Sequence, residues 1–436
     1  MSQLPVKRWD PSRREIVIQE LRDRQAGYDR QTEAVVREII ATVKEKGDEA
    51  LLDYTARFDR ASLTPETLRV TEKEMETAWR AVDEPYRQAL ENACRQITAF
   101  HQKQRQESWF ENPQEGIWLG QKVTPLDVAG VYVPGGKAAY PSSVLMNVVP
   151  ARVAGVSRIV MATPPGPDGT IAPVILAAAR VAGVTEIYKM GGAQAVAALA
   201  YGTATIPRVD KITGPGNQYV AMAKQLVYGQ VDIDMIAGPS EILVIADETA
   251  NAAFVAADML SQAEHDEMAS AVCITTSQAL GEAVAQELEK QVAQLDREAI
   301  ARESLERFGG IWVTATLAEA AALANDLAPE HLELCVANPF ELVPAIRHAG
   351  AIFLGHYSPE PLGDYLAGPN HVLPTGGTAR FASPLTVEDF VKKSSLIYYS
   401  RERLAEAADD IMLLAEREGF QAHKQAVAIR MKPEIG

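Results

Sequence analysis

Short apolar runs and longer amphipathic stretches alternate along most of the chain. Strands are expected at residues 128–133, 158–162, 186–189 and 209–212, and a helical pattern follows each of them. A second series has strands expected at residues 242–246, 271–275, 311–313, 332–334 and 351–354. Strands and helices that alternate at this spacing form βαβ units. The sequence therefore predicts an α/β fold with two parallel sheets in tandem, joined by the loop at residues 232–241, although the two series show no strong self-similarity.

The two flanks of these series are charged and helix-prone. Near the N-terminus, an apolar stripe among charged residues consists of Val35, Ile39, Ile40 and Val43. The tail at residues 387–427 reads as amphipathic helix. Residues 355–385 are rich in glycine and proline, so a long loop without regular structure is expected there, and such loops usually carry function.

The composition narrows the classes of partner. The chain has 436 residues and a formal net charge of −16, which argues against nucleic acid and anionic membrane surfaces. No apolar run reaches membrane-spanning length, and the first residues lack the apolar core of a signal peptide. Cys94, Cys273 and Cys335 are widely spaced, which fits a reduced cytoplasm and excludes a zinc site built from local thiolates. A cytoplasmic protein without membrane or nucleic-acid partners is therefore expected.

Glycine-rich turns follow three expected strands of the first series. They are Pro134-Gly135-Gly136, Gly191-Gly192-Ala193-Gln194 and Gly214-Pro215-Gly216-Asn217. Open parallel sheets bind ligands at the carboxyl ends of their strands, and the last turn opens a helix as a phosphate cradle should. The third glycine of the dinucleotide fingerprint is missing, so ordinary tight turns are an alternative explanation.

Polar residues of another kind occur in the second series. Gln262 and His265 stand three apart at the end of an apolar helical pattern, so both can point the same way toward a zinc or magnesium ion. A polar helix end is the alternative. Glu330 and His331 place a carboxylate beside an imidazole just ahead of a strand, which suits proton transfer.

Further candidates lie toward the C-terminus. The long loop contains Asp364 and His371, and the tail contains Glu418 and His423. Gln262, His265, Asp364 and His423 together would form a nitrogen and oxygen site for zinc or a similar divalent ion. Taken singly, Asp364 could be a turn residue and His423 a surface histidine. Cys335 could act as a nucleophile, but its place in an apolar strand favours inert packing.

Long strings of residues closely resemble the histidinol dehydrogenase family. The resemblance covers about residues 34–427 in the family's order, and its strings are Val209-Asp210-Lys211-Ile212-Thr213-Gly214-Pro215-Gly216-Asn217, Ala237-Gly238-Pro239-Ser240-Glu241, Ser261-Gln262-Ala263-Glu264-His265-Asp266, Ala328-Pro329-Glu330-His331-Leu332, Gly368-Pro369-Asn370-His371-Val372-Leu373-Pro374-Thr375 and residues 418–426.

The resemblance implies a zinc-dependent, NAD-linked, four-electron oxidation of L-histidinol through L-histidinaldehyde to L-histidine. The family's catalytic pair falls on Glu330 and His331. Its zinc ligands, one ion per subunit, fall on Gln262, His265, Asp364 and His423. Substrate contacts fall, besides the zinc ligands, on Ser240, His331, His371 and Glu418. NAD contacts fall on Tyr132, Gln194 and Asn217.

The resemblance also implies an architecture. Two incomplete Rossmann-like domains are expected, with residues 129–239 binding NAD and residues 31–128 plus 240–384 carrying zinc and catalysis. Residues 1–30 and 385–436 would be helical terminal segments. The C-terminal segment would be exchanged in a homodimer, so that Glu418 and His423 come from the partner subunit.

Two other functions fit parts of this pattern. A paralogue could oxidise a different polar alcohol on the same scaffold, but its substrate contacts should then drift, and Ser240, His371 and Glu418 are all in place. A catalytically inactive binding protein could hold zinc and an imidazole ligand, but the intact Glu330-His331 pair speaks against it. The number of NADH molecules formed per alcohol consumed separates the three.

Overall fold

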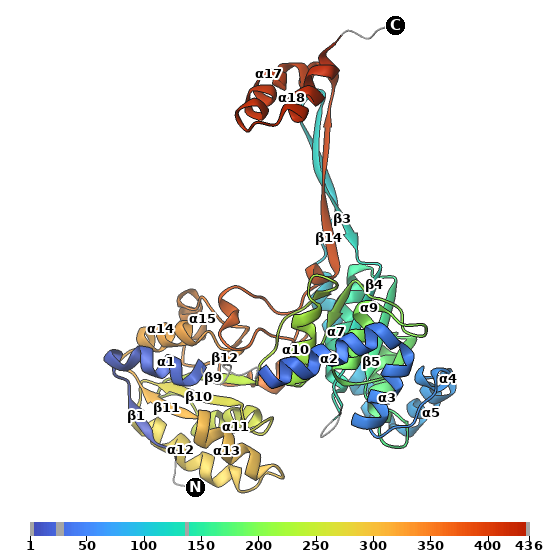
Figure 1. Cartoon of the computed structure of the whole chain (residues 1–436). Coiled ribbons are helices and arrows are strands. Elements are labelled where there is room, and N and C mark those ends of the chain that lie inside the picture. The colour runs from blue at the N-terminus through green and yellow to red at the C-terminus, as the bar shows by residue number, and fades with distance from the viewer. Residues whose placement is uncertain (1–3, 23–29, 136–138, 433–436) are drawn as a thin grey trace. The chain divides into compact units, whose positions relative to one another are not determined.

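The chain divides into two compact units. A computed structural model describes residues 4–22, 30–135 and 139–432. The first unit comprises Met1–Gln104 and Leu126–Phe390, and the second comprises Arg105–Pro125 and Val391–Gly436 (Figure 1). None of the described helices is long and apolar enough to cross a membrane. The expected separation of residues 129–239 from residues 31–128 and 240–384 as ligand-binding domains stays a prediction.

The first parallel sheet has the strand order β6-β5-β4-β7-β8. Its strands are β4 (Val128–Tyr132), β5 (Arg158–Thr163), β6 (Glu186–Lys189), β7 (Lys211–Thr213) and β8 (Asp232–Ile233). The helices between and after them are α7 (Pro141–Ala154), α8 (Pro173–Ala182), α9 (Gly192–Tyr201) and α10 (Gln218–Val227). The predicted alternation is confirmed, and only the short edge strand β8 was not expected.

The second parallel sheet has the order β1-β11-β10-β9-β12-β13. Its strands are β1 (Val6–Arg8), β9 (Glu241–Ala246), β10 (Ser270–Thr275), β11 (Gly310–Val313), β12 (His331–Cys335) and β13 (Ala351–Leu354). The helices are α11 (Ala252–Ala263), α12 (Gln278–Val292), α13 (Glu298–Phe308), α14 (Leu317–Leu327), α15 (Pro339–Leu342) and α16 (Glu360–Tyr365). Every residue of β9, β10, β11 and β12 is buried, because helices cover both faces of such a sheet.

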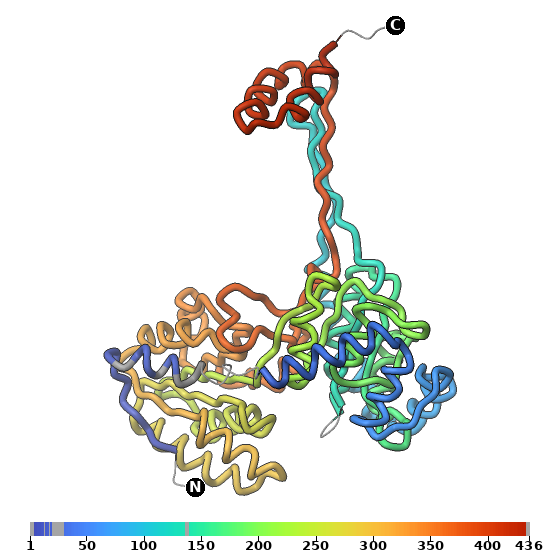
Figure 2. The backbone as a smooth tube through the Cα atoms, in the orientation of Figure 1, coloured from blue at the N-terminus to red at the C-terminus, as the bar shows by residue number. Residues whose placement is uncertain are grey.

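The two sheets share one topology. Counted along the chain within each series, both have the strand order third, second, first, fourth, fifth, and β1 joins the second sheet beside its third strand. Figure 2 shows this N-terminal strand lying along β11, far away in sequence. The N-terminal segment is therefore not purely helical as expected, because three of its residues complete a sheet edge before α1 (Arg14–Arg22) begins.

Helices of the N-terminal half pack on the helices that flank the first sheet. They are α2 (Arg30–Lys46), α3 (Asp48–Phe58), α4 (Pro65–Leu68), α5 (Glu72–Ala81) and α6 (Glu84–Gln102). The predicted apolar stripe of α2 is buried at Ile39, Ile40 and Val43, in a core shared with α9 and α10. Val36 rather than Val35 completes this stripe, since Val35 is 39% exposed.

The second unit is built on an antiparallel sheet in the order β14-β3-β2. Its elements are β2 (Trp109–Gln114), β3 (Ile117–Pro125), β14 (Val391–Tyr399), α17 (Arg401–Arg417) and α18 (Gln421–Ala428). β3 and β14 form a long ribbon, and the two helices follow it at the end where Ile117 pairs with Tyr399 (Figure 1). The prediction of helix throughout residues 387–427 is therefore wrong at β14, which pairs with β3 along its full length. Its Leu396-Ile397-Tyr398-Tyr399 run was a strand signal.

The expected structureless loop at residues 355–385 contains regular structure. α16 begins after Pro359, and a 3₁₀ turn occupies Thr378–Arg380. The other 3₁₀ turns are Pro11–Arg13, Val343–Ala345, Val387–Phe390 and Ile429–Met431. α16 matters for the site because it carries both Glu360 and Asp364.

Candidate functional site

The carboxyl edge of the first sheet presents backbone N–H groups and one buried amide. Tyr132 ends β4, and its hydroxyl oxygen accepts a hydrogen bond of 3.1 Å from the N–H of Gly192, the first residue of α9. Burial raises the pKa of Tyr132 to about 12, so the phenol is neutral. Gln194, in the first turn of α9, is 1% exposed, and neither polar atom of its side chain has a hydrogen-bond partner among the described residues.

The next turn along this edge is held rigidly. Gly214 has a φ of +118°, and a Cβ there would lie 1.9 Å from the carbonyl oxygen of Tyr132, so only glycine fits. Asp234 accepts a 2.8 Å hydrogen bond from the Gly214 N–H and pairs with the buried Lys224. Asn217 caps α10 by accepting from the N–H groups of Tyr219 and Val220, and its contact with NAD stays a prediction.

The polar residues of the second sheet gather at the opposite edge. His331 opens β12, and it lies level with Ile242, the second residue of β9. Glu241 opens β9. Gln262 lies in the last turn of α11, which returns the chain to this same edge. Glu241, Gln262 and His331 therefore lie at the amino edge of the second sheet rather than after its strands.

Two glutamates form a reciprocal pair at this edge. The N–H of Glu241 donates to Oε2 of Glu330 over 2.9 Å, and the N–H of Glu330 donates to Oε2 of Glu241 over 3.3 Å. Burial, followed by the charge of Glu241, raises the pKa of Glu330 well above its usual value. Glu330 therefore binds a proton far more readily than an exposed carboxylate does.

His331 has a defined tautomer. Its Nδ1 lies 2.9 Å from the carbonyl oxygen of Glu241, which can only accept, so Nδ1 carries the proton. Burial lowers the pKa of His331 to about 4, and the ring is neutral near pH 7. The remaining nitrogen, Nε2, is buried without a hydrogen-bond partner among the described residues. Its lone pair is free to accept a proton.

Gln262 and His265 approach the same place from α11. Gln262 is fully buried, and both polar atoms of its amide lack hydrogen-bond partners among the described residues. His265 follows the helix, and its Nδ1 lies 3.4 Å from the hydroxyl oxygen of Ser240. The prediction that these two side chains share a metal ion stays a prediction.

α16 supplies two carboxyl groups beside His331. Single ligand atoms of His331, Glu360 and Asp364 all lie within 4.8 Å of one another. Although burial alone would raise it, the pKa of Asp364 is held at about 2 by His371, whose Nδ1 lies 3.4 Å from Oδ1 of Asp364. Burial, with the charge of Asp364, raises the pKa of Glu360 to about 9. One neutral and one charged carboxyl group therefore face the same imidazole at neutral pH.

Glu418 and His423 belong to the second unit. Glu418 directly follows α17 and His423 lies on α18, and both side chains are exposed. The ring of His423 lies 5.0 Å from that of Phe420, centroid to centroid. Their part in zinc and substrate binding stays a prediction.

Sequence reasoning missed Glu241 and Glu360. Glu241 is a charged residue at the start of an otherwise apolar strand, which is a detectable signal. Glu360 follows a proline at a helix start, where an acidic residue is commonplace, so nothing local separates it from a capping residue. The expected core role of Cys335 agrees with the structure, because burial raises the pKa of its thiol.

Comparisons with known proteins agree with this arrangement. A sequence model described as histidinol dehydrogenase matches residues 22–431. The chain is 61% identical over 404 residues to histidinol dehydrogenase of Geobacter sulfurreducens, covering 92% of this chain and 94% of that protein. It is 57% identical over 413 residues to histidinol dehydrogenase of Halalkalibacterium halodurans, covering 95% and 97%.

A solved structure is similar over almost the whole chain. The crystal structure of histidinol dehydrogenase from Elizabethkingia anophelis superposes with a TM-score of 0.93 at 38% identity, covering 98% of both chains. The family model and the curated relatives each span more than nine tenths of this chain. The chain therefore belongs to the histidinol dehydrogenase family and is an oxidoreductase.

Proposed function

We propose that this chain oxidises L-histidinol to L-histidine, through L-histidinaldehyde, in two NAD-linked steps with one zinc ion per subunit. The observation that carries the proposal is the buried, unpartnered Nε2 of His331, on a ring with a ligand atom within 4.8 Å of the carboxylate of Asp364, together with the buried amide of Gln262, which also lacks a hydrogen-bond partner among the described residues. A buried polar atom without a partner costs about 1–3 kcal/mol, so a folded protein rarely leaves several together unless a ligand satisfies them.

The donor set fits a divalent cation. The amide oxygen of Gln262 needs a partner, and Asp364 is ionised near neutral pH because its pKa is about 2. Gln262, His265 and Asp364, with His423 of the partner subunit, would hold zinc. When bound, zinc would supply positive charge and open positions for the amine and imidazole nitrogens of histidinol, and NAD would accept hydride.

His331 is the general base of the first step. Nε2 accepts the proton of the alcohol while the carbinol carbon loses hydride, and Nδ1 keeps its hydrogen bond to the carbonyl of Glu241. This bond fixes the ring's orientation and tautomer. Ser240 and His371, with Glu418 of the partner subunit, would position the substrate.

Glu330 acts between the two oxidations. The aldehyde must add water before its second hydride can leave, and Glu330 accepts the proton of that water. Its raised pKa makes its carboxylate a stronger base than an exposed glutamate. His331 then takes a hydroxyl proton of the hydrate during the second oxidation.

The carboxyl edge of the first sheet fits a dinucleotide. The backbone N–H groups there lie at helix N-termini, which favour phosphate, and Gln194 offers an amide donor and acceptor without partners. Tyr132, Gln194 and Asn217 would contact NAD. Exposed apolar side chains of the second unit, including Ile397, Leu414 and Phe420, support a homodimer in which this segment is exchanged.

The stoichiometry of NADH formation tests the proposal. Zinc-loaded protein should form two NADH per L-histidinol consumed, and L-histidine should accumulate. One NADH from a different alcohol would favour a paralogue. No NADH from folded, zinc-loaded protein, with histidinol still bound, would favour an inactive binding protein.

A further inference from the structure

The carboxylate of Asp59 reaches the glycine turn that opens α9. Asp59 directly follows α3 and accepts a hydrogen bond from the N–H of Gly191. A Cβ on Gly191 would lie 3.3 Å from Oδ1 of Asp59 and 2.6 Å from Cβ of Pro164. Asp59 therefore lies against the Gly191 turn, and Pro164, the first residue after β5, approaches the same glycine.

One oxygen of this carboxylate is unused. Oδ2 of Asp59 is buried without a hydrogen-bond partner among the described residues. Burial raises the pKa of Asp59 to about 6, which reflects how poorly the charge is solvated. The helix that this turn opens contains the orphaned amide of Gln194, and its first N–H donates to the hydroxyl of Tyr132 from β4. The unused oxygen therefore lies where ligand atoms are expected.

The topology of the first sheet indicates what this oxygen binds. Counted along the chain, its order is third, second, first, fourth, fifth, as in dinucleotide-binding sheets. Such sheets usually have an acidic residue after the second strand, where it accepts from the 2′-hydroxyl of the adenosine ribose. Here the second strand, β5, is followed by Pro164 and Pro165, and the acidic residue of this loop, Asp168, already accepts hydrogen bonds from the N–H and hydroxyl of Thr170. Asp59 brings a carboxylate to this place from another part of the chain.

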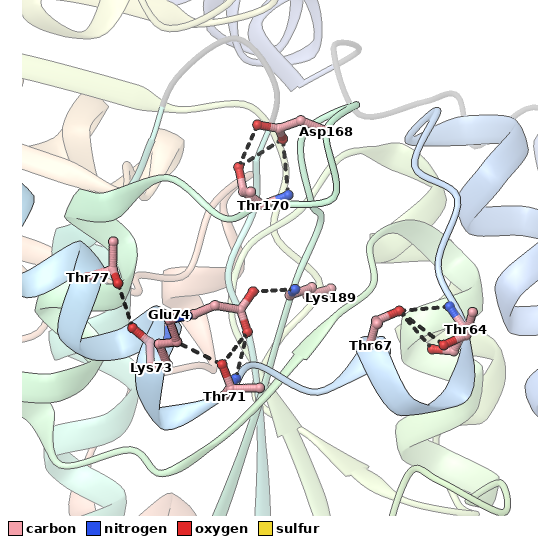
Figure 3. Close-up of polar contacts among 9 residues, drawn as sticks. All are labelled: Thr64, Thr67, Thr71, Lys73, Glu74, Thr77, Asp168, Thr170 and Lys189. Carbon is pink, nitrogen blue, oxygen red and sulfur yellow. Dashed lines mark hydrogen bonds and ion pairs between the residues drawn. The ribbon is translucent and has the colours of Figure 1, made fainter.

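How the turn is built supports a ligand role. Lys189 ends β6, two residues before Gly191, and it pairs with Glu74 of α5 (Figure 3). This ion pair engages the lysine of the strand that leads into the turn. A carboxylate with one oxygen held by Gly191 and one free can take a hydroxyl donor, and it repels a phosphate at the same position.

We propose that Asp59 binds the 2′-hydroxyl of the adenosine ribose of NAD and thereby selects NAD over NADP. The proposal rests on the proposed NAD-linked function. Asp59 touches the cofactor rather than the reacting atoms, so its loss changes dinucleotide affinity and leaves kcat at saturating NAD within about twofold of the original.

A thermodynamic cycle that combines the substitution Asp59→Asn with removal of the adenosine 2′-hydroxyl from NAD tests the proposal. Equilibrium binding of NAD, of its analogue lacking the adenosine 2′-hydroxyl, and of NADP is measured on the original protein and on Asp59→Asn. The original protein should bind the analogue about tenfold more weakly than it binds NAD. The Asp59→Asn variant should bind the analogue and NAD with about equal affinity. Asp59→Asn should also narrow the preference for NAD over NADP by about tenfold.

The contrary results are equally definite. If the missing hydroxyl weakens binding to both proteins by the same factor, or to neither, Asp59 only caps α9 and the proposal is wrong. Should Asp59→Asn not fold, Asp59→Ala takes its place in the same cycle, and failure of the original protein to discriminate against the analogue would by itself overturn the proposal. Asp53→Asn is the control, since this exposed carboxylate of α3 pairs only loosely with Arg57 at 3.6 Å. Binding needs no turnover, so a failure of histidinol oxidation would be seen separately.

Discussion

Two buried glutamines lie at opposite edges of two sheets that share one topology. Gln194 and Gln262 are each at most 1% exposed, and both amides lack partners among the described residues. Gln194 lies in the first turn of its helix, at the carboxyl edge of the first sheet. Gln262 lies in the last turn of its helix, at the amino edge of the second sheet.

The difference follows from helix direction. In both sheets the helices run opposite to the strands, so helix N-termini meet the carboxyl edge and helix C-termini meet the amino edge. An N-terminus carries partial positive charge and favours phosphate, whereas a C-terminus carries partial negative charge and favours a cation. The edge used by each sheet thus matches the charge of the ligand proposed for it.

The largest expected effect is the loss of kcat when His331, at the amino edge of the second sheet, is replaced. His331→Asn should lower kcat by about 10²–10⁴-fold while histidinol still binds, because the base for both proton transfers is gone. His356→Asn is the control: this histidine lies 3.3 Å from Thr249, just beyond the carboxyl end of β9. Steady-state kinetics and calorimetric binding measure both. Equal losses in the two variants would mean that the amino edge is not the catalytic one.

The metal should depend on one glutamine only. Gln262→Met removes a ligand oxygen at nearly unchanged volume, so zinc affinity should fall by at least about 10–100-fold. Gln194→Met should bind zinc like the original protein and should instead bind NAD about tenfold more weakly. Zinc content after dialysis and NAD titration measure the two. Zinc loss in both variants, or in neither, would remove the distinction between the edges.

His331, at the amino edge of the second sheet, should also make the free energy of unfolding depend on pH. Because burial lowers the pKa of His331 to about 4, the unfolded chain takes up a proton below about pH 6.5 while the folded chain does not. The free energy of unfolding should therefore fall by about 2 kcal/mol between pH 7 and pH 5 through this residue. Chemical denaturation of metal-free protein should show a smaller loss in His331→Asn.

Asp59, at the carboxyl edge of the first sheet, should change the pH dependence of the free energy of unfolding in the opposite direction. Its folded pKa is raised to about 6, so the folded chain binds the proton first and gains stability as the pH falls below 6. Asp59→Asn should therefore steepen the acid loss that His331→Asn reduces. If both variants change the pH dependence in the same direction, these pKa assignments are wrong.

The smallest expected effect is a change in the free energy of unfolding when either glutamine is replaced by methionine. An unsatisfied buried amide is unfavourable, so methionine at either position should raise the free energy of unfolding of the ligand-free protein by about 1 kcal/mol. Thermal unfolding without zinc or NAD measures this change. A loss of stability in either variant would indicate that its amide has a structural partner.

Much of the first unit follows from local sequence. The apolar runs within β4, β9 and β10 indicated buried parallel strands, and the glycine turns indicated the carboxyl edge of the first sheet as a candidate ligand site. The second unit was harder, because β14 derives its structure from pairing with β3, more than 260 residues away in sequence for every pair. Strand pairing at such a distance leaves no periodic signal in either segment.

By itself, the sequence determined the alternating α/β pattern and the identity of the polar residues that precede or follow the strands, because spacing and side-chain chemistry are local properties. Only the tertiary structure decided that Glu241 orients His331, that Glu360 faces it, and that Asp59 reaches the Gly191 turn. Tautomer, burial and pKa depend on which distant groups surround an atom, and the folded chain alone brings those groups together.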